Sequence, residues 1–163
     1  MSITFAGNPV VLKNEPLKVG EILPSFTVVG EDLGEKQLTD FPGKKIILSV
    51  PSIDTDVCDL ELRRFNQEIE KLDGFTTIAV SMDLPFAQAR WCQAKSVNNL
   101  HIFSDFRHHN FGLNYGVYME DIGLLARAVF VADEDNKLVH VEYVSEVTEE
   151  PDYDKALEAA KNL

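Results

Sequence analysis

Cys58 and the residues just before it have the types and spacing that thiol chemistry needs. Thr55 lies three residues ahead of Cys58, and threonine is well suited to the N-cap of a helix. A thiol at the third helical position can reach unpaired backbone N–H groups, which together with the helix dipole favour an anion. The thiolate is the nucleophilic form, so this spacing indicates a reactive Cys58. The alternative is that Cys58 only heads a buried helix stripe, since free cysteine is among the most buried residue types.

A thiolate at Cys58 needs a nearby cation, because three acidic residues crowd it and oppose its charge. These acidic residues are Asp54, Asp56 and Asp59. The candidate cations are Arg63, Arg64, Arg90, Arg107 and Arg127. Arg127 leads straight into the apolar run at residues 128–131, where a guanidinium is costly to bury unless it is paired or faces a cleft. Arginines on helices are more often solvated. We therefore expect Arg127 to be the partner of Cys58.

A strand and a helix must position these residues. Residues 45–50 form an apolar, β-branched run of strand length. After Thr55, apolar side chains recur in steps of three and four, at Leu62, Phe65, Ile69 and Leu72. This periodicity predicts a helix that ends near residues 73–74 and carries Cys58 on its inward face. The strand therefore feeds the helix through residues 51–54.

The rest of the chain continues the alternation of strands and helices. Further strands are expected at residues 26–29, 75–81, 100–103, 124–132 and 137–144, with a short extension at 37–39. Helices are expected at residues 84–95, with Phe86, Ala89 and Cys92 on one side, at 108–114, and at 154–162, with Ala156, Leu157 and Ala160 inward. Residues 3–6 and 10–13 flank Gly7-Asn8-Pro9 and predict a hairpin.

This order predicts an α/β domain of the thioredoxin-like class, with a mixed central sheet and helices on both faces. We expect one domain over residues 1–163, with the N-terminal β-hairpin as an extension over residues 1–14. In such sheets ligands bind beyond the carboxyl ends of parallel strands. Cys58 lies at that place, which favours a functional role for it.

Composition limits the partners and the compartment. The 163 residues include 27 acidic and 15 basic side chains, for a net charge of −12, which argues against binding nucleic acid or an anionic membrane. No apolar run approaches the ~20 residues of a membrane span, and the N-terminus lacks a basic start. We therefore expect a cytoplasmic protein. Two cysteines are too few for a disulfide framework, and a disulfide between them is expected to be transient and catalytic.

Other chemistries find little support in the sequence. It has no glycine-rich nucleotide motif, no Gly-x-Ser-x-Gly and no His-Glu-x-x-His. His108 and His109 are adjacent and point to different faces of a helix, so with His101 they make a poor metal site. We expect neither a metal nor a cofactor. A cysteine protease would need a histidine to activate the thiol, and the sequence leaves His101 and His140 open for that role.

Three stretches of the chain resemble a known family. Residues 51–58, Pro-Ser-Ile-Asp-Thr-Asp-Val-Cys, resemble the peroxidatic motif of the thiol peroxidase subfamily of peroxiredoxins. Residues 81–92 and 124–131 are similar to further motifs of the same subfamily. The predicted N-terminal hairpin also fits, so the resemblance covers nearly the whole chain.

The resemblance implies a thiol-dependent peroxidase that reduces hydrogen peroxide and organic hydroperoxides without a cofactor. It implies Cys58 as the peroxidatic residue, and Thr55 and Arg127 as its activating partners. Cys58 would become a sulfenic acid, which Cys92 of the same chain would resolve as an intramolecular disulfide. Thioredoxin would reduce that disulfide by exchange, and the chain would form a homodimer. One departure is that Gln-Ala-Lys-Ser follows Cys92 where relatives often have glycines, so this helix is expected to open less readily.

Two other functions stay open at this point. A thioredoxin-like dithiol oxidoreductase would carry Cys-x-x-Cys, but residue 61 is Glu. A non-catalytic, redox-regulated binding domain would keep the fold without turnover.

The resolving step also requires motion. Cys58 opens one predicted helix and Cys92 lies about two turns into another, whereas a disulfide needs Cα atoms within roughly 7 Å. We therefore expect a reduced state that keeps the thiols apart and an oxidised state in which both segments have locally unwound.

Overall fold

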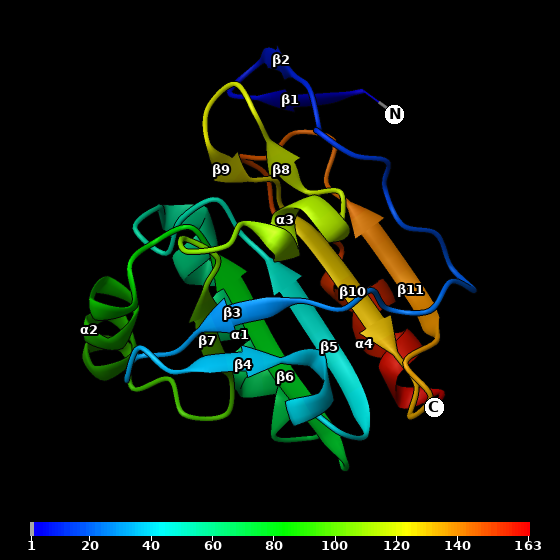
Figure 1. The fold of residues 1–163 in the computed structure, drawn as a ribbon. Helices are drawn as coiled ribbons and strands as arrows, with labels where there is room; N and C mark the ends of the chain where they lie inside the picture. Colours follow the sequence, from blue (N-terminus) through cyan, green and yellow to red (C-terminus); the bar gives the residue numbers. More distant parts are fainter. Residues whose placement is uncertain (1) are drawn as a thin grey trace.

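The computed structural model describes residues 2–163 and contains a seven-stranded mixed sheet at its centre (Figure 1). Met1, which belongs to the predicted extension, lies outside the described residues. The parallel strands are β5 (Lys44–Ser49), β6 (Phe75–Ser81) and β7 (His101–Ser104). Antiparallel strands complete both sides: β10 (Ala128–Ala132) and β11 (Leu138–Tyr143) beside β5, and β3 (Thr27–Val29) and β4 (Glu35–Gln37) beside β7.

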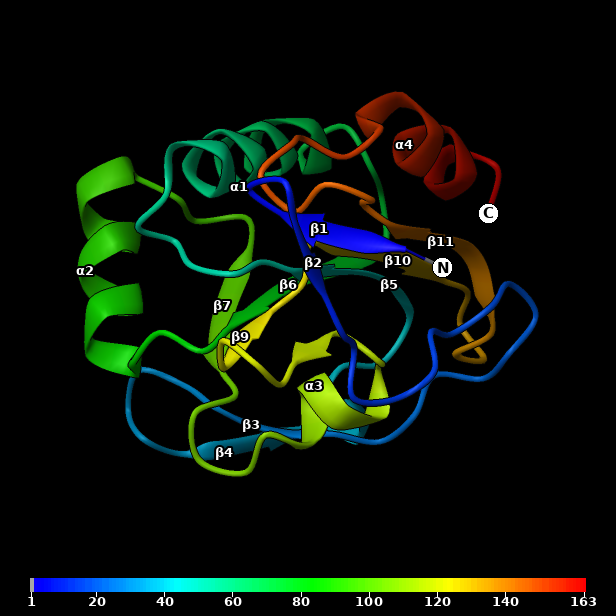
Figure 2. The same cartoon turned by 90° about the horizontal axis from the view of Figure 1, so that it is seen from above.

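Helices cover both faces of this sheet. Figure 2 shows α1 (Asp56–Ile69) and α4 (Tyr153–Lys161) on one side and α3 (Asn110–Asn114) on the other. The remaining α-helix, α2 (Pro85–Lys95), packs against β7. The predicted mixed sheet with helices on both faces is therefore confirmed.

The apolar run of β5 supplies both cores. Ile46 and Leu48 pack with the α1 and α4 side chains, whereas Ile47 packs on the opposite face with Phe111 and Phe130. Neighbouring residues of a strand point to opposite faces, so a strand that is buried on both sides reads as a continuous apolar run. This double burial fixes the end of β5, from which the chain continues towards Cys58.

The predicted N-terminal hairpin is present, but its turn is shifted. Strands β1 (Ile3–Phe5) and β2 (Asn8–Val10) are joined by Ala6 and Gly7, whose φ angles are 51° and 80°. A two-residue turn with two positive φ angles matches the twist of the strands, so the second strand begins at Asn8 and not at residue 10. Thr4 exchanges backbone hydrogen bonds with Ser145 and Val147, which attaches the hairpin to the chain after β11.

The single strand predicted over residues 124–132 is wrong. The structure has β9 (Leu124–Leu125), which pairs with β8 (Tyr118–Met119), and then β10 in the main sheet. The chain changes sheets at Ala126 and Arg127. A continuous apolar run gives no periodic signal of such a change, because both strands are buried.

Other boundaries also differ from the prediction. Helix α1 ends at Ile69, and a turn follows as far as Gly74, which has a φ of 75°. Residues 35–37 form strand β4, and the expected extension at 37–39 is largely the 3₁₀ helix η1 (Leu38–Asp40). Asp40 accepts a hydrogen bond from the Gln37 backbone, which stabilises that turn.

Helix α2 buries a different face from the one its apolar residues suggest. Phe86 is 60% exposed, whereas Pro85, Gln88 and Trp91 are buried. Gln88 can face inward because its side-chain amide donates hydrogen bonds to Ser81 Oγ and to the Phe103 carbonyl oxygen. The helix ends at Ser96, which adopts the left-handed conformation with a φ of 54°.

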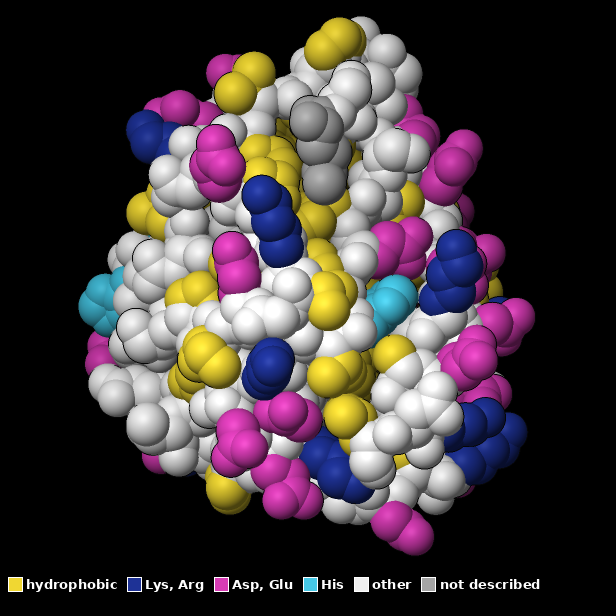
Figure 3. Space-filling model, turned by 90° about the vertical axis from the view of Figure 1, so that its right-hand side faces the viewer, with side chains coloured by type: hydrophobic (Ala, Val, Ile, Leu, Met, Phe, Trp, Pro, Cys, Tyr) yellow, Lys and Arg dark blue, Asp and Glu magenta, His cyan; other side chains and the backbone are white. Residues whose placement is uncertain are grey.

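Charged side chains are spread over the surface. Figure 3 shows acidic groups distributed across one face of the molecule, among basic side chains and small apolar patches. Within residues 2–163, none of the helices has both the length and the apolar character needed to cross a membrane.

Candidate active site

Thr55 begins helix α1 as the sequence predicts. Its backbone is extended, and its hydroxyl oxygen accepts a hydrogen bond of 3.2 Å from the Cys58 N–H. The same hydroxyl donates to the Ser52 carbonyl oxygen at 3.3 Å. Thr55 therefore bonds to two backbone groups in this state, and not to the Cys58 sulfur. Cys58 is the third residue of the helix and is fully buried.

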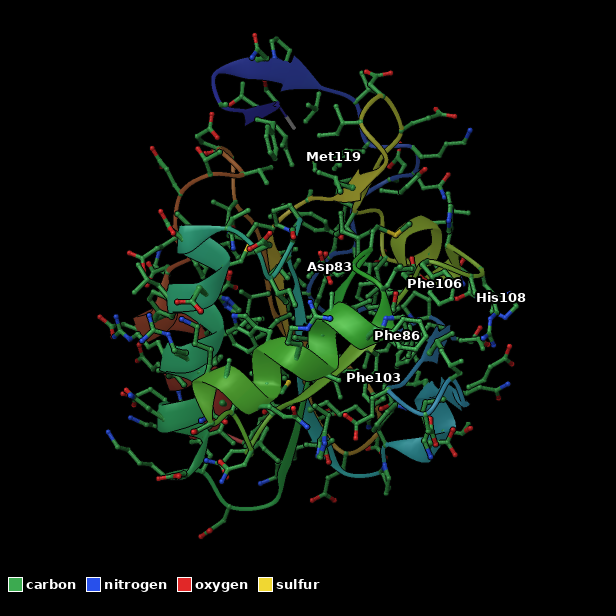
Figure 4. The ribbon with its side chains drawn as sticks, turned by 90° about the vertical axis from the view of Figure 1, so that its left-hand side faces the viewer. Asp83, Phe86, Phe103, Phe106, His108 and Met119 are labelled. Carbon is green, nitrogen blue, oxygen red and sulfur yellow. The ribbon has the colours of Figure 1, made fainter. Side chains whose placement is uncertain are left out.

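The loop that precedes the helix is held by Asp83. One carboxylate oxygen accepts hydrogen bonds from the Ile53 N–H at 2.9 Å and from Ser81 Oγ at 2.6 Å. The other accepts from Ser52 Oγ at 2.7 Å. Asp83 lies just before α2, near its first turn (Figure 4). It fixes the loop through two of its residues, and sequence reasoning had not assigned it a role.

Arg127 contacts the sulfur through its guanidinium group. Its side chain is 1% exposed, and Nη2 donates to Cys58 Sγ at 3.1 Å. Nε donates to the Val147 carbonyl oxygen at 2.8 Å, which fixes the plane of the guanidinium. The structure therefore brings together the cation and the thiol that the sequence analysis paired.

The other candidate side chains have other surroundings. Arg63, Arg64 and Arg107 pair with carboxylates of Asp59, Asp154 and Glu35, respectively. Among the histidines considered, His101 is exposed, and His108 bonds to Glu35. The hydrogen-bond donor to Cys58 Sγ is an arginine and not a histidine, which removes the geometric basis for a cysteine protease.

Glu61 is a member of the site that sequence reasoning missed. Its Oε2 accepts from Arg127 Nη1, its side chain is fully buried, and its Oε1 has no hydrogen-bond partner. Burial raises the pKa of Glu61 to about 7, and the Arg127 charge opposes this rise. A signal was available, because Glu61 lies three residues after Cys58 on the inward stripe of the helix. A carboxylate at such a position is rare unless it is paired.

One cation therefore faces two acidic groups in a water-poor site. The guanidinium of Arg127 bonds to Cys58 through one terminal nitrogen and to Glu61 through the other. Its positive charge stabilises a thiolate most strongly when Glu61 carries a proton, because the carboxyl group is then neutral. The arrangement suits a buried nucleophilic sulfur that has a fixed hydrogen-bond donor.

A small hollow of about 180 Å³ leads to this group. Most of its wall is apolar, with Phe5 from the N-terminal hairpin and with Pro51, Val57 and Val147, while Thr55 and Arg127 supply polar groups. The hairpin thus contributes directly to the entrance of the site.

Cys92 lies apart from this hollow. It is half-buried on α2 and lines a different hollow of about 270 Å³, together with Gln88, Val97 and His101. Burial raises the pKa of its thiol, and the Glu31 carboxylate raises it further. Both cysteines are free, as expected for a reduced state. This state therefore does not bring the two thiols together.

The chain is similar to known proteins over nearly its whole length. The family model described as Redoxin matches residues 18–157. The thiol peroxidase of Bacillus subtilis is 52% identical over 162 residues, which cover 99% of this chain and 97% of that protein. The chain belongs to the thiol peroxidases of the peroxiredoxin family. The thiol peroxidase of Streptococcus gordonii is 49% identical and covers 98% of this chain and 99% of its own length.

Solved structures extend the likeness to the fold. A peroxiredoxin-like protein from Aquifex aeolicus superposes with a TM-score of 0.91 at 40% identity, covering 99% of this chain and 96% of that one. A thiol peroxidase from Chromobacterium violaceum gives the same TM-score at 21% identity, with the same coverage, which bears on the fold alone. The predicted thioredoxin-like fold and the predicted thiol-dependent peroxidase activity on hydroperoxides are therefore confirmed.

We predict that Glu61→Gln weakens the pH dependence of stability. Glutamate in an unfolded chain loses its proton near pH 4.5, and buried Glu61 loses it near 7. The contribution of its protonated form is complete below pH 4.5 and is lost as the pH rises to about 7. This change amounts to up to about 3 kcal/mol of unfolding free energy for the pKa shift, which the glutamine variant should lack.

Urea unfolding of the reduced protein at pH 4.5 and pH 8 measures this difference. Glu158→Gln is the matched control, because it removes an exposed carboxylate from α4 and should leave the pH dependence unchanged. The same pH dependence in wild type and in Glu61→Gln would contradict the prediction.

Proposed function

We propose that Cys58 is the peroxidatic residue and that Arg127 activates it. The observation that supports this proposal most directly is the 3.1 Å hydrogen bond from Arg127 Nη2 to the Cys58 sulfur, which is fully buried at a helix N-terminus. The thiolate attacks one oxygen of the hydroperoxide, so an S–O bond forms as the O–O bond breaks. The leaving oxygen takes a proton and departs as water or an alcohol, and Cys58 becomes a sulfenic acid. Arg127 stabilises the charge that moves from sulfur to oxygen.

Thr55 has a supporting part in this proposal. Its hydroxyl caps the helix and thereby sets the position of the Cys58 backbone. A small rotation of that hydroxyl would let it bond to a peroxide oxygen within the hollow that it lines.

Cys92 is the proposed resolving residue. It forms an intramolecular disulfide with Cys58, and thioredoxin reduces that disulfide by thiol–disulfide exchange. Support comes from the resemblance of residues 81–92 to the subfamily motif and from the free state of both thiols. The composition supports a cytoplasmic location, because the chain has a net charge of −12 and its two cysteines are free.

We also propose a homodimer, on the resemblance to the subfamily. Sedimentation should then give a species of about twice the 18.3 kDa chain mass, and an 18.3 kDa species alone at working concentration would contradict it.

Substitution of each cysteine separates their roles. We predict that Cys58→Ser abolishes peroxide reduction, because no other thiol has the helix N-terminus and Arg127 beside it. Cys92→Ser should still form a sulfenic acid with one equivalent of peroxide but should not be recycled by thioredoxin. Trapping of the sulfenic acid with dimedone, followed by mass spectrometry, measures the first step, and peroxide consumption with a thioredoxin system measures turnover. Equal single-turnover oxidation of the two variants would refute the assignment.

The apolar hollow supports organic hydroperoxides as substrates alongside hydrogen peroxide. We predict that Phe5→Ala lowers kcat/KM for cumene hydroperoxide by about tenfold, because a bulky apolar group loses contact area at the entrance. The value for hydrogen peroxide should stay within about twofold, since hydrogen peroxide presents no apolar surface. Phe86→Ala is the matched control, because it deletes the same side chain from an exposed position on α2. Equal losses for both substrates in Phe5→Ala would show that the hairpin does not select them.

A further inference from the structure

One hydrogen bond joins the neighbours of the two cysteines. Trp91, which precedes Cys92, donates from Nε1 to Asp59 Oδ1 at 2.9 Å, and Asp59 directly follows Cys58. The contact links the first turn of α1 to the second turn of α2, and Figure 4 shows α2 lying beside α1. Trp91 is 9% exposed and the Asp59 side chain 18%, so water has little access to the bond.

Two cations, Arg63 and Lys95, also hold the Asp59 carboxylate in place. Arg63 donates to Oδ2 through Nε at 3.0 Å and through Nη2 at 2.8 Å. Lys95, near the end of α2, places Nζ 3.6 Å from Oδ1. Hydrogen bonds to an ionised and oriented acceptor are stronger than neutral ones.

The contact also sets the direction in which Cys92 points. Successive residues of an α-helix lie about 100° apart around its axis. With Trp91 held towards α1, the Cys92 side chain turns away from α1, into the hollow that it shares with Val97 and His101. Cys92 can therefore approach Cys58 only after α2 rotates or unwinds, and either movement separates Trp91 from Asp59.

We infer that the Asp59–Trp91 hydrogen bond is a latch that controls the resolving step of the reaction. This inference rests on the proposed resolving role of Cys92. When the latch opens, the Cys92 sulfur attacks the sulfenic sulfur of Cys58: the S–S bond forms, the S–O bond breaks, and the hydroxyl leaves with the Cys92 proton as water. While the latch is closed, the sulfenic acid stays exposed to a second hydroperoxide, which would oxidise it to the sulfinic acid.

Single-turnover kinetics of the reduced full chain test the latch. Trp91→Phe removes the indole N–H and keeps an aromatic ring, and Asp59→Ala removes the acceptor. Each should accelerate disulfide formation by about tenfold, which corresponds to about 1.4 kcal/mol. Trp91→Phe keeps every charge near Cys58 and should leave the rate of sulfenic acid formation unchanged. Asp59→Asn keeps an acceptor for Trp91 and should accelerate disulfide formation less than Asp59→Ala does. Acid quenching and mass spectrometry resolve both steps.

Two further variants test whether helix stability alone explains the effect. Gln93→Ala changes an exposed residue beside Cys92 on α2 and should leave the rate of disulfide formation unchanged. Lys95→Ala removes one partly exposed ion pair to Asp59 without deleting a buried atom, and should accelerate the step by about twofold. Variants that form the disulfide faster should also resist sulfinic acid formation better at high peroxide. Trp91→Phe and Asp59→Ala should therefore be the most resistant.

Tryptophan fluorescence gives a direct signal, because Trp91 is the single tryptophan of the chain. In wild type, the emission should shift to longer wavelength when the disulfide forms. In reduced Asp59→Ala, it should shift part of the way towards the oxidised spectrum.

Wild-type rates of disulfide formation in folded Trp91→Phe, Asp59→Ala and Lys95→Ala would overturn the latch and leave the proposed function intact. If wild type forms no Cys58–Cys92 disulfide, the proposed resolving role of Cys92 is contradicted. The latch is then contradicted as well, because it rests on that role.

Discussion

The buried guanidinium of Arg127 is the interaction on which the rest of the site depends. A buried arginine costs several kcal/mol of desolvation unless its N–H groups are paired. Here the Val147 carbonyl, the Glu61 carboxyl and the Cys58 sulfur are its partners. Loss of any one partner would leave an N–H group of Arg127 unpaired in the core. The guanidinium therefore restricts which residues can surround it. The same charge favours the thiolate that the chemistry requires.

Segments from distant parts of the chain must meet for this cation to reach the sulfur. Strand β5 leads to Cys58, whereas Arg127 directly precedes β10, which pairs with β5 in the sheet. Asp83 holds the intervening loop from the end of β6, and the hairpin closes over the entrance through its backbone bonds to the segment after β11. The central sheet therefore brings residues that are distant in the sequence together in one compact site.

The features that local rules determine could be predicted from the sequence. Thr55 and the stripe beyond it gave the start of α1, and the β-branched run at residues 75–81 gave β6 with its observed bounds. Arg127 could be chosen because a guanidinium entering an apolar run needs a partner. The role that we propose for Cys92 came from the resemblance to a known subfamily, because no spacing could have given it.

Features that depend on tertiary contacts escaped the sequence analysis. The break at Arg127 lies between two short apolar runs, and neither run has a periodicity that shows the chain changing sheets. Phe86 seemed suited to the core by type, yet Gln88 took the buried position because Ser81 and Phe103 satisfy its amide. Glu61 entered the sequence analysis only because a Cys-x-x-Cys motif would need a cysteine at that position. Its partner, Arg127, is 66 residues away in the sequence.

Ser96 gives the end of α2 a property that helix propensity alone would not suggest. Residues 93–95 are helical, but Ser96 holds a left-handed backbone with a φ of 54°, a conformation that side-chain-bearing residues adopt at a cost of about 1 kcal/mol or more. That strain exists only while the helix is wound. Unwinding from this end releases the strain, which lowers the free-energy cost of opening the last turn of α2.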